Sequence, residues 1–143
     1  MKNYKKILVE EKREIPMAIL LGGLITTARL LDHFTTTQQL VNIGRRSVAS
    51  IPKTRQPQET QLRKIELWAN RISSIIPGSH CLHRATAAHV LLGLQGLNSK
   101  IIIGFRTRKN VEAHAWLEVQ DGHKIHLIFS TENEGFKSKW ILE

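Results

Sequence analysis

The chain has 143 residues, of which 41% are hydrophobic and 23% charged, which is the size and composition of a single globular domain and excludes a disordered chain. Its one cysteine excludes an internal disulfide and suits the reducing cytoplasm, where we expect the protein to act. The formal net charge of +9 favours an acidic partner, but the basic residues are scattered and no nucleic-acid-binding signature is present, so we expect no nucleic acid partner.

The first half of the sequence predicts helices. The apolar run from Ile15 to Ala28 is shorter than the ~20 residues of a membrane span, so it predicts a buried helix instead. Pro16 suits the first turn of that helix, because its missing N–H is not needed there. Ser79 can cap a later helix that begins at the only cysteine, Cys81. Together with the apolar periodicity, these signals predict four helices, at about 16–34, 38–49, 59–76 and 81–94.

The pattern changes from helix to strand after Gly96, a residue that suits the end of the fourth helix. Strands are predicted at 100–106, 113–119 and 124–129, the last two joined by a turn at Asp121-Gly122. The expected class is α+β: N-terminal helices, then a cysteine-bearing helix packed on a three-stranded antiparallel sheet. We expect one domain, 1–143, with a helical part at 1–58, a core at 59–143 and a docking segment at Trp140-Ile141-Leu142.

The candidate chemistry lies at Cys81 and His114. A cysteine at the start of a helix is favoured as a thiolate by the helix dipole, although a lone cysteine there is more often only packed. His114 falls on the predicted middle strand, where it can take the thiol proton and return it to a leaving amine. Trp116 alternates onto the same face of that strand and can shield the pair from water.

Residues 66–119 resemble the transglutaminase-like peptidase domain of lasso-peptide B proteins. The matching motifs, in the family's order and spacing, are Cys81-Leu82-His83-Arg84-Ala85, Leu91-Leu92, Gly96-Leu97, Ile103-Gly104-Phe105 and Ala113-His114-Ala115-Trp116-Leu117-Glu118-Val119. The resemblance implies a bacterial cysteine peptidase, without metal or cofactor, that removes the leader from a ribosomal lasso-peptide precursor. It also implies two partners besides the precursor, which are a leader-recognition protein of winged-helix type and an ATP-dependent macrolactam cyclase. We expect the leader-recognition protein to be a separate chain, because the length of this chain suits the split form of the family.

The third catalytic position departs from the family's pattern. The family carries an acid about twelve residues after the histidine, and this sequence has His126 there, which is our prediction for the orienting residue. Asp121 is expected to be only a turn residue, while Glu118, Glu132 and Glu134 are alternatives. Arg84 and Trp116 are predicted to contact substrate. The missing acid leaves a second hypothesis open, namely a weakened or inactive adaptor that presents the leader to the cyclase. A third hypothesis is transfer of the acyl group to an amine.

Overall fold

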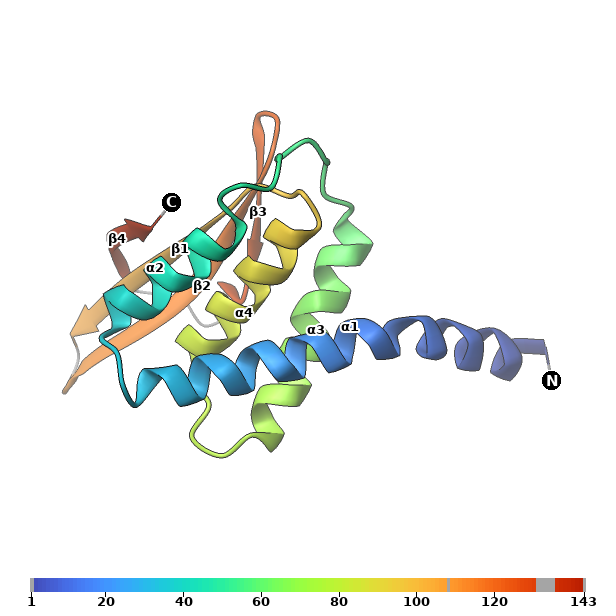
Figure 1. Cartoon of the computed structure of the whole chain (residues 1–143), viewed down its shortest axis with the longest axis horizontal. Coiled ribbons are helices and arrows are strands. Elements are labelled where there is room, and N and C mark those ends of the chain that lie inside the picture. The colour runs from blue at the N-terminus through green and yellow to red at the C-terminus, as the bar shows by residue number, and fades with distance from the viewer. Residues whose placement is uncertain (1, 108, 131–135, 143) are drawn as a thin grey trace.

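The computed structural model describes the backbone of residues 2–107, 109–130 and 136–142, and the side chains of residues 14–107, 109–130 and 136. The helices are α1 (Lys2–Asp32), α2 (Thr37–Val48), α3 (Glu59–Ile75) and α4 (Cys81–Leu94). The strands are β1 (Ser99–Thr107), β2 (Val111–Asp121), β3 (Lys124–Ile128) and β4 (Lys137–Leu142). The described strands form one antiparallel sheet in the order β3-β2-β1-β4. The helices gather beside the sheet, and the N-terminal half of α1 extends beyond the rest of the molecule (Figure 1).

The predicted α+β class is confirmed, and the three predicted strands are all present. The structure adds a fourth strand, because the tail that contains Trp140-Ile141-Leu142 pairs with β1, placing Ile141 opposite Ile102. The predicted docking segment is therefore an edge strand of the chain's own sheet. Gly96, with a φ of 76°, ends α4 as expected, since glycine adopts this left-handed conformation without a steric cost.

The first helix differs from its prediction in two ways. It begins at Lys2, so Pro16 lies inside α1 rather than in its first turn. Contacts with α3 hold the helix next to this proline: Glu14 accepts a hydrogen bond from Trp68 Nε1 at 2.8 Å and pairs with Lys64 Nζ at 2.7 Å. These contacts offset the main-chain hydrogen bond that the proline removes.

The expectation that the apolar run of α1 is buried was wrong for much of its length. Leu21 and Ile25 are fully buried, but Ile19 is 70% exposed and Leu30 is 58% exposed. By length and composition alone, Glu14–Asp32 could cross a membrane, and only 17% of this window is buried. The helix therefore contributes one stripe to the core and leaves another stripe uncovered.

The two faces of the β1–β2 pair have different neighbours. Paired residues share a face, as in Ile103 opposite Ala115 and Gly104 opposite His114, so odd-numbered residues lie on one face and even-numbered residues on the other. Helix α4 covers the odd-numbered face, because its His89 bonds to Ser99 Oγ at 2.9 Å; we call this the α4 face. On the even-numbered face, a Cβ added to Gly104 would lie 2.7 Å from the Trp116 ring; we call this the Trp116 face.

His89 makes folding stability depend on pH. It is 6% exposed, and burial, followed by the nearby positive charges of Lys53 and Arg45, lowers its pKa from 6.5 to about 4. The unfolded chain therefore takes up this proton at a higher pH than the folded chain, so stability is lost as the pH falls below 6.5 and through about 4. Between about pH 7.5 and about pH 5, we expect His89 alone to lower the free energy of unfolding by about 2 kcal/mol, measured by urea denaturation without phosphate.

Two variants isolate this contribution. His89→Gln removes the titrating ring, so its stability should fall by about 2 kcal/mol less than that of the wild type over the same pH interval. His123→Gln replaces an exposed histidine and should follow the wild type. An equal loss of stability in the wild type and His89→Gln would contradict the prediction.

Candidate active site

Cys81 is the first residue of α4 and is half-buried. The N-cap of this helix is His80, not the predicted Ser79, because the turn before the helix is one residue longer than the sequence suggested. The backbone N–H of His80 donates to His83 Nδ1 at 3.0 Å, so a side chain inside the first turn satisfies the donor just outside it. The position of the cysteine is thus set by its own helix start.

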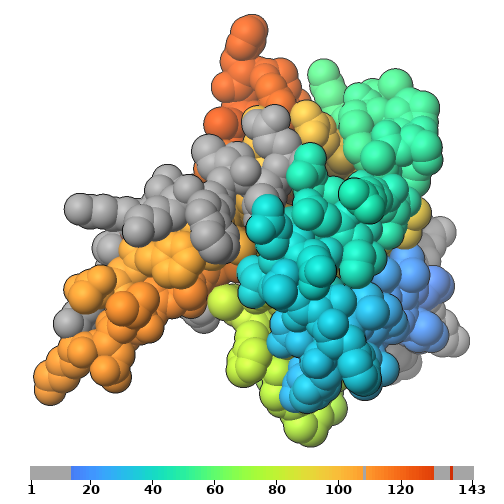
Figure 2. Space-filling model, turned by 60° about the vertical axis from the view of Figure 1, so that its left-hand side comes forward, coloured from blue at the N-terminus to red at the C-terminus, as the bar shows by residue number. Residues whose placement is uncertain are grey.

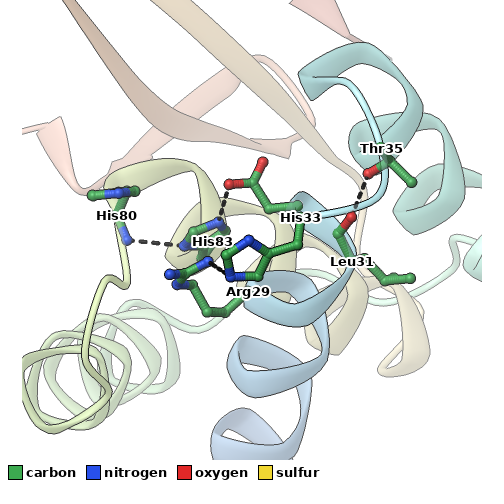
Figure 3. A network of polar contacts seen from close by, with 7 residues as sticks. Arg29, Leu31, His33, Thr35, His80 and His83 are labelled. Atoms are coloured by element: carbon green, nitrogen blue, oxygen red, sulfur yellow. Dashed lines mark hydrogen bonds and ion pairs between the residues drawn. The ribbon is translucent and has the colours of Figure 1, made fainter.

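The imidazole of His83 also connects α4 to the end of α1 (Figure 3). His83 is buried, and its Nε2 lies 3.3 Å from Asp32 Oδ2. Because Nδ1 accepts a hydrogen bond from an N–H, Nε2 must carry the proton of the neutral ring. Nε2 therefore donates a hydrogen bond to the carboxylate. Burial lowers the pKa of His83, an effect that Asp32 partly opposes, which favours this neutral form. Beside it, Arg29 Nη1 bonds to His33 Nε2 at 2.7 Å.

A cavity of about 540 Å³ opens beside Cys81. In Figure 2 the surface is hollowed between the projecting end of the β1–β2 pair (orange), the start of α2 (cyan) and the segment before α4 (yellow-green). The lining residues come from α4, the sheet and the start of α2: Cys81, Leu82, Ile103, Phe105, Ala113, His114, Ala115, Thr36, Thr37 and Gln38. The two predicted catalytic residues therefore line one cavity.

Sequence reasoning missed the contribution of α2 to this cavity. The signal for its start was present, since Thr36 and Gln39 form a capping box. Thr36 Oγ1 accepts the N–H of Gln39 at 3.3 Å, and Gln39 Oε1 accepts the N–H of Thr36 at 2.9 Å. That the capped end of α2 meets the cysteine helix depends on tertiary packing, which no local pattern contains.

His114 is buried on the Trp116 face of β2. Its Nε2 lies 3.0 Å from the carbonyl oxygen of Phe129, and its ring stacks on Trp116 at a centroid distance of 6.0 Å. A carbonyl only accepts, so Nε2 carries the ring proton, and Nδ1 is the nitrogen that accepts a proton in the neutral ring. In the part of the chain that the structure describes, no hydrogen bond joins this ring to Cys81 Sγ.

The structure does not bring His126 to His114. His126 lies opposite Val119, five residues along β2 from His114 or about 16 Å at ~3.3 Å per residue, and its Nε2 contacts Asp121 Oδ2 at 3.5 Å. The orienting contact on His114 is instead the main-chain carbonyl of Phe129. Glu118 lies four residues along β2 from His114, opposite Lys100 and Leu127. Glu132 and Glu134 are outside the described residues.

A residue of α3 holds the loop that contains the Phe129 carbonyl. The N–H of Phe129 donates to Glu66 Oε1 at 2.7 Å, and Phe129 has a φ of 64°, which is uncommon for a residue with a side chain. Arg84 also contacts this loop, because its guanidinium lies 5.4 Å from the centre of the Phe129 ring. Its Nη1 donates to Asn70 Oδ1 of α3 at 2.7 Å. Neither Arg84 nor Trp116, the two predicted substrate contacts, is among the residues that line the cavity.

Comparison with models of known families gives a match over most of the chain. A model of the transglutaminase-like superfamily, which includes cysteine proteases and transglutaminases, matches residues 27–136. No curated protein and no solved structure matches the chain. The matched segment spans more than half of the sequence and holds the cysteine of α4 and the histidine of β2 in their α+β setting. The chain belongs to the transglutaminase-like superfamily.

Proposed function

We propose that the protein is a cysteine peptidase that removes the leader from a ribosomal lasso-peptide precursor, with Cys81 as the nucleophile and His114 as the general acid and base. The observation that carries the proposal is that Cys81 and His114 are both among the residues that line one cavity, with the cysteine at the first residue of a helix. The leader-peptidase assignment rests further on the order and spacing of the Cys81 and His114 motifs. We place the reaction in the cytoplasm, in keeping with a chain that has a single cysteine.

The proposed reaction has two stages. The Cys81 thiolate attacks the carbonyl carbon of the scissile bond, and the main-chain N–H of Cys81 supports the oxyanion. The C–N bond then breaks, the leaving amine takes the proton held by His114, and a thioester remains. Water, deprotonated by His114, hydrolyses the thioester to a free leader carboxylate and restores the thiol. In the structure the His114 side chain lies on the face of β2 opposite α4. We therefore propose that its ring turns toward Sγ in the substrate complex, where catalytic contacts tighten relative to the free enzyme.

The cavity also indicates what lies beside the scissile bond. Among the residues that the structure describes, the lining contains no ionisable side chain besides His114 and the Cys81 thiol, and most of it is apolar. We therefore propose that an uncharged substrate side chain occupies it, because an unpaired charge there would lose its hydration without compensation. A separate winged-helix protein would hold the leader, and an ATP-dependent cyclase would use the released core peptide.

A second candidate is an adaptor that binds the leader and presents it to the cyclase without cutting it. One observation favours it: among the described residues, the group that contacts His114 Nε2 is a neutral carbonyl. A carbonyl stabilises an imidazolium less than a carboxylate does. The two candidates differ in the fate of the precursor, which mass spectrometry measures directly.

The test incubates the protein with a candidate lasso-peptide precursor and a candidate leader-binding protein of winged-helix type. Peptidase activity predicts two fragments whose summed mass exceeds the precursor by one water. With a primary amine added, a transferase would instead yield a leader fragment carrying that amine. Stable binding of an uncut precursor would overturn the peptidase proposal in favour of the adaptor.

A further inference from the structure

A second cavity, of about 420 Å³, lies farther along α2 and α4 and shares no lining residue with the cavity at Cys81. Basic side chains define it: Arg45 and Arg46 from the last turn of α2, and Lys53 from the loop that follows. His89 of α4 and Ser99 at the start of β1 also line it. Nothing in the proposed peptidase reaction uses this cavity.

The positive charge here is not balanced by carboxylates. Among the residues that the structure describes, no acidic residue lines the cavity and none of the three cations forms an ion pair. Arg45 has one polar contact, a long one of 3.5 Å to Asn42 Oδ1. Lys53 Nζ donates to the carbonyls of Val48 and Gly93, both at 3.1 Å, which leaves the third N–H of its ammonium for another acceptor.

The cavity is also partly withdrawn from water. Burial lowers the pKa of Lys53, and burial together with the charges of Lys53 and Arg45 lowers that of His89. His89 Nε2 is buried without a hydrogen-bond partner, although Nδ1 bonds to Ser99 Oγ. Buried polar groups in native proteins are nearly always satisfied. When Ser99 Oγ donates to Nδ1, Nε2 carries the ring proton and requires an acceptor, and an anion that meets this need would also offset the three unbalanced cations beside it.

We propose that this cavity binds a phosphate group, held by Arg45, Arg46 and Lys53. A phosphate dianion offsets more of the three positive charges than a carboxylate can, and its oxygens match the paired donors of a guanidinium. The group could be the free ion or the end of a phosphate monoester, since the two present the same oxygens. The cavity would thus give the chain a second ligand site, independent of chemistry at Cys81.

The full chain is titrated with inorganic phosphate, phenyl phosphate and acetate at constant ionic strength and pH, followed by heteronuclear NMR. We expect saturable binding of phosphate, with shifts at the end of α2, His89 and Ser99. The pKa of the His89 ring should rise when phosphate is bound, because a nearby anion favours the charged imidazole. Tighter binding of phenyl phosphate would identify a monoester as the source of the group, and equal binding the free ion; both results support a phosphate site.

Matched variants separate a built site from general attraction to a basic protein. Arg45→Gln and Arg46→Gln should each weaken phosphate binding, and together at least tenfold. Arg63→Gln removes the same charge from an exposed position on α3 and should change binding less than twofold. Equal weakening by Arg63→Gln, acetate binding as tight as phosphate, or no saturable binding at all would overturn the proposal. Circular dichroism confirms that each variant is folded.

Discussion

Cys81→Ala is expected to reduce precursor cleavage at least about 10⁴-fold, because a transfer reaction without its nucleophile retains only binding and oxyanion stabilisation. The residue is half-buried at the first position of α4, and the contacts that fix this helix start belong to His80 and His83 rather than to Sγ. We therefore expect the free energy of unfolding to change by less than about 1 kcal/mol. Cleavage is measured by mass spectrometry and stability by urea denaturation.

A second measurement checks the reactivity of the thiol itself. If the start of α4 favours the thiolate, iodoacetamide should modify Cys81 faster than a free thiol near neutral pH. Because the chain has one cysteine, the rate reports this residue without interference. Unchanged cleavage by Cys81→Ala would contradict the nucleophile assignment, and a slow thiol combined with unchanged precursor maturation would favour the adaptor.

His114→Gln should lower the cleavage rate about 10³-fold, because it removes the acid and base that activates the thiol and protonates the leaving amine. The glutamine amide can still donate to the carbonyl of Phe129, the contact that His114 Nε2 makes now, so the loop should keep its position. The rate is followed by the appearance of the leader fragment, with near-ultraviolet circular dichroism to report the packing of Trp116.

The matched control is His126→Gln, which changes the same residue type on the neighbouring strand β3. His126 lies about 16 Å from His114 along the sheet and contacts Asp121, so its replacement should change the rate less than about threefold. A loss as large as that of His114→Gln would show that His126 acts on the histidine after all. Full activity in His114→Gln would remove His114 from the mechanism.

The features that could be predicted were those that depend on neighbouring residues. The bounds of α4 followed from the break at Pro77-Gly78 and from Gly96, and the β2–β3 hairpin from Asp121-Gly122. The position of Pro16 inside α1 was not predictable in this way, because Glu14 is held by residues about fifty positions away on α3. Strand β4 was likewise missed, since its pairing with β1 is a long-range contact of a short polar tail.

In the candidate site, too, the features that depend on nearby residues could be predicted and those that depend on distant contacts could not. Placing Cys81 at a helix start needed only local signals, and placing His114 on an inner strand needed only the order of the strands. The Phe129 carbonyl, which His114 Nε2 contacts, could not be found by counting residues, because it is a main-chain atom. Its position depends on the left-handed backbone of Phe129 and on the hydrogen bond that the Phe129 N–H donates to Glu66. A search for acidic side chains at a fixed spacing does not detect a carbonyl.

The start of α2 has one further consequence for the cavity beside Cys81. The first residues of α2 and the first residues of α4 both line it, so two helices direct the positive ends of their peptide dipoles at the same space. In the proposed reaction, negative charge on the sulfur or on a tetrahedral oxygen would thus be supported by main-chain groups and not only by side chains. Peptide groups do not titrate, so this support persists throughout the pH range in which the protein stays folded.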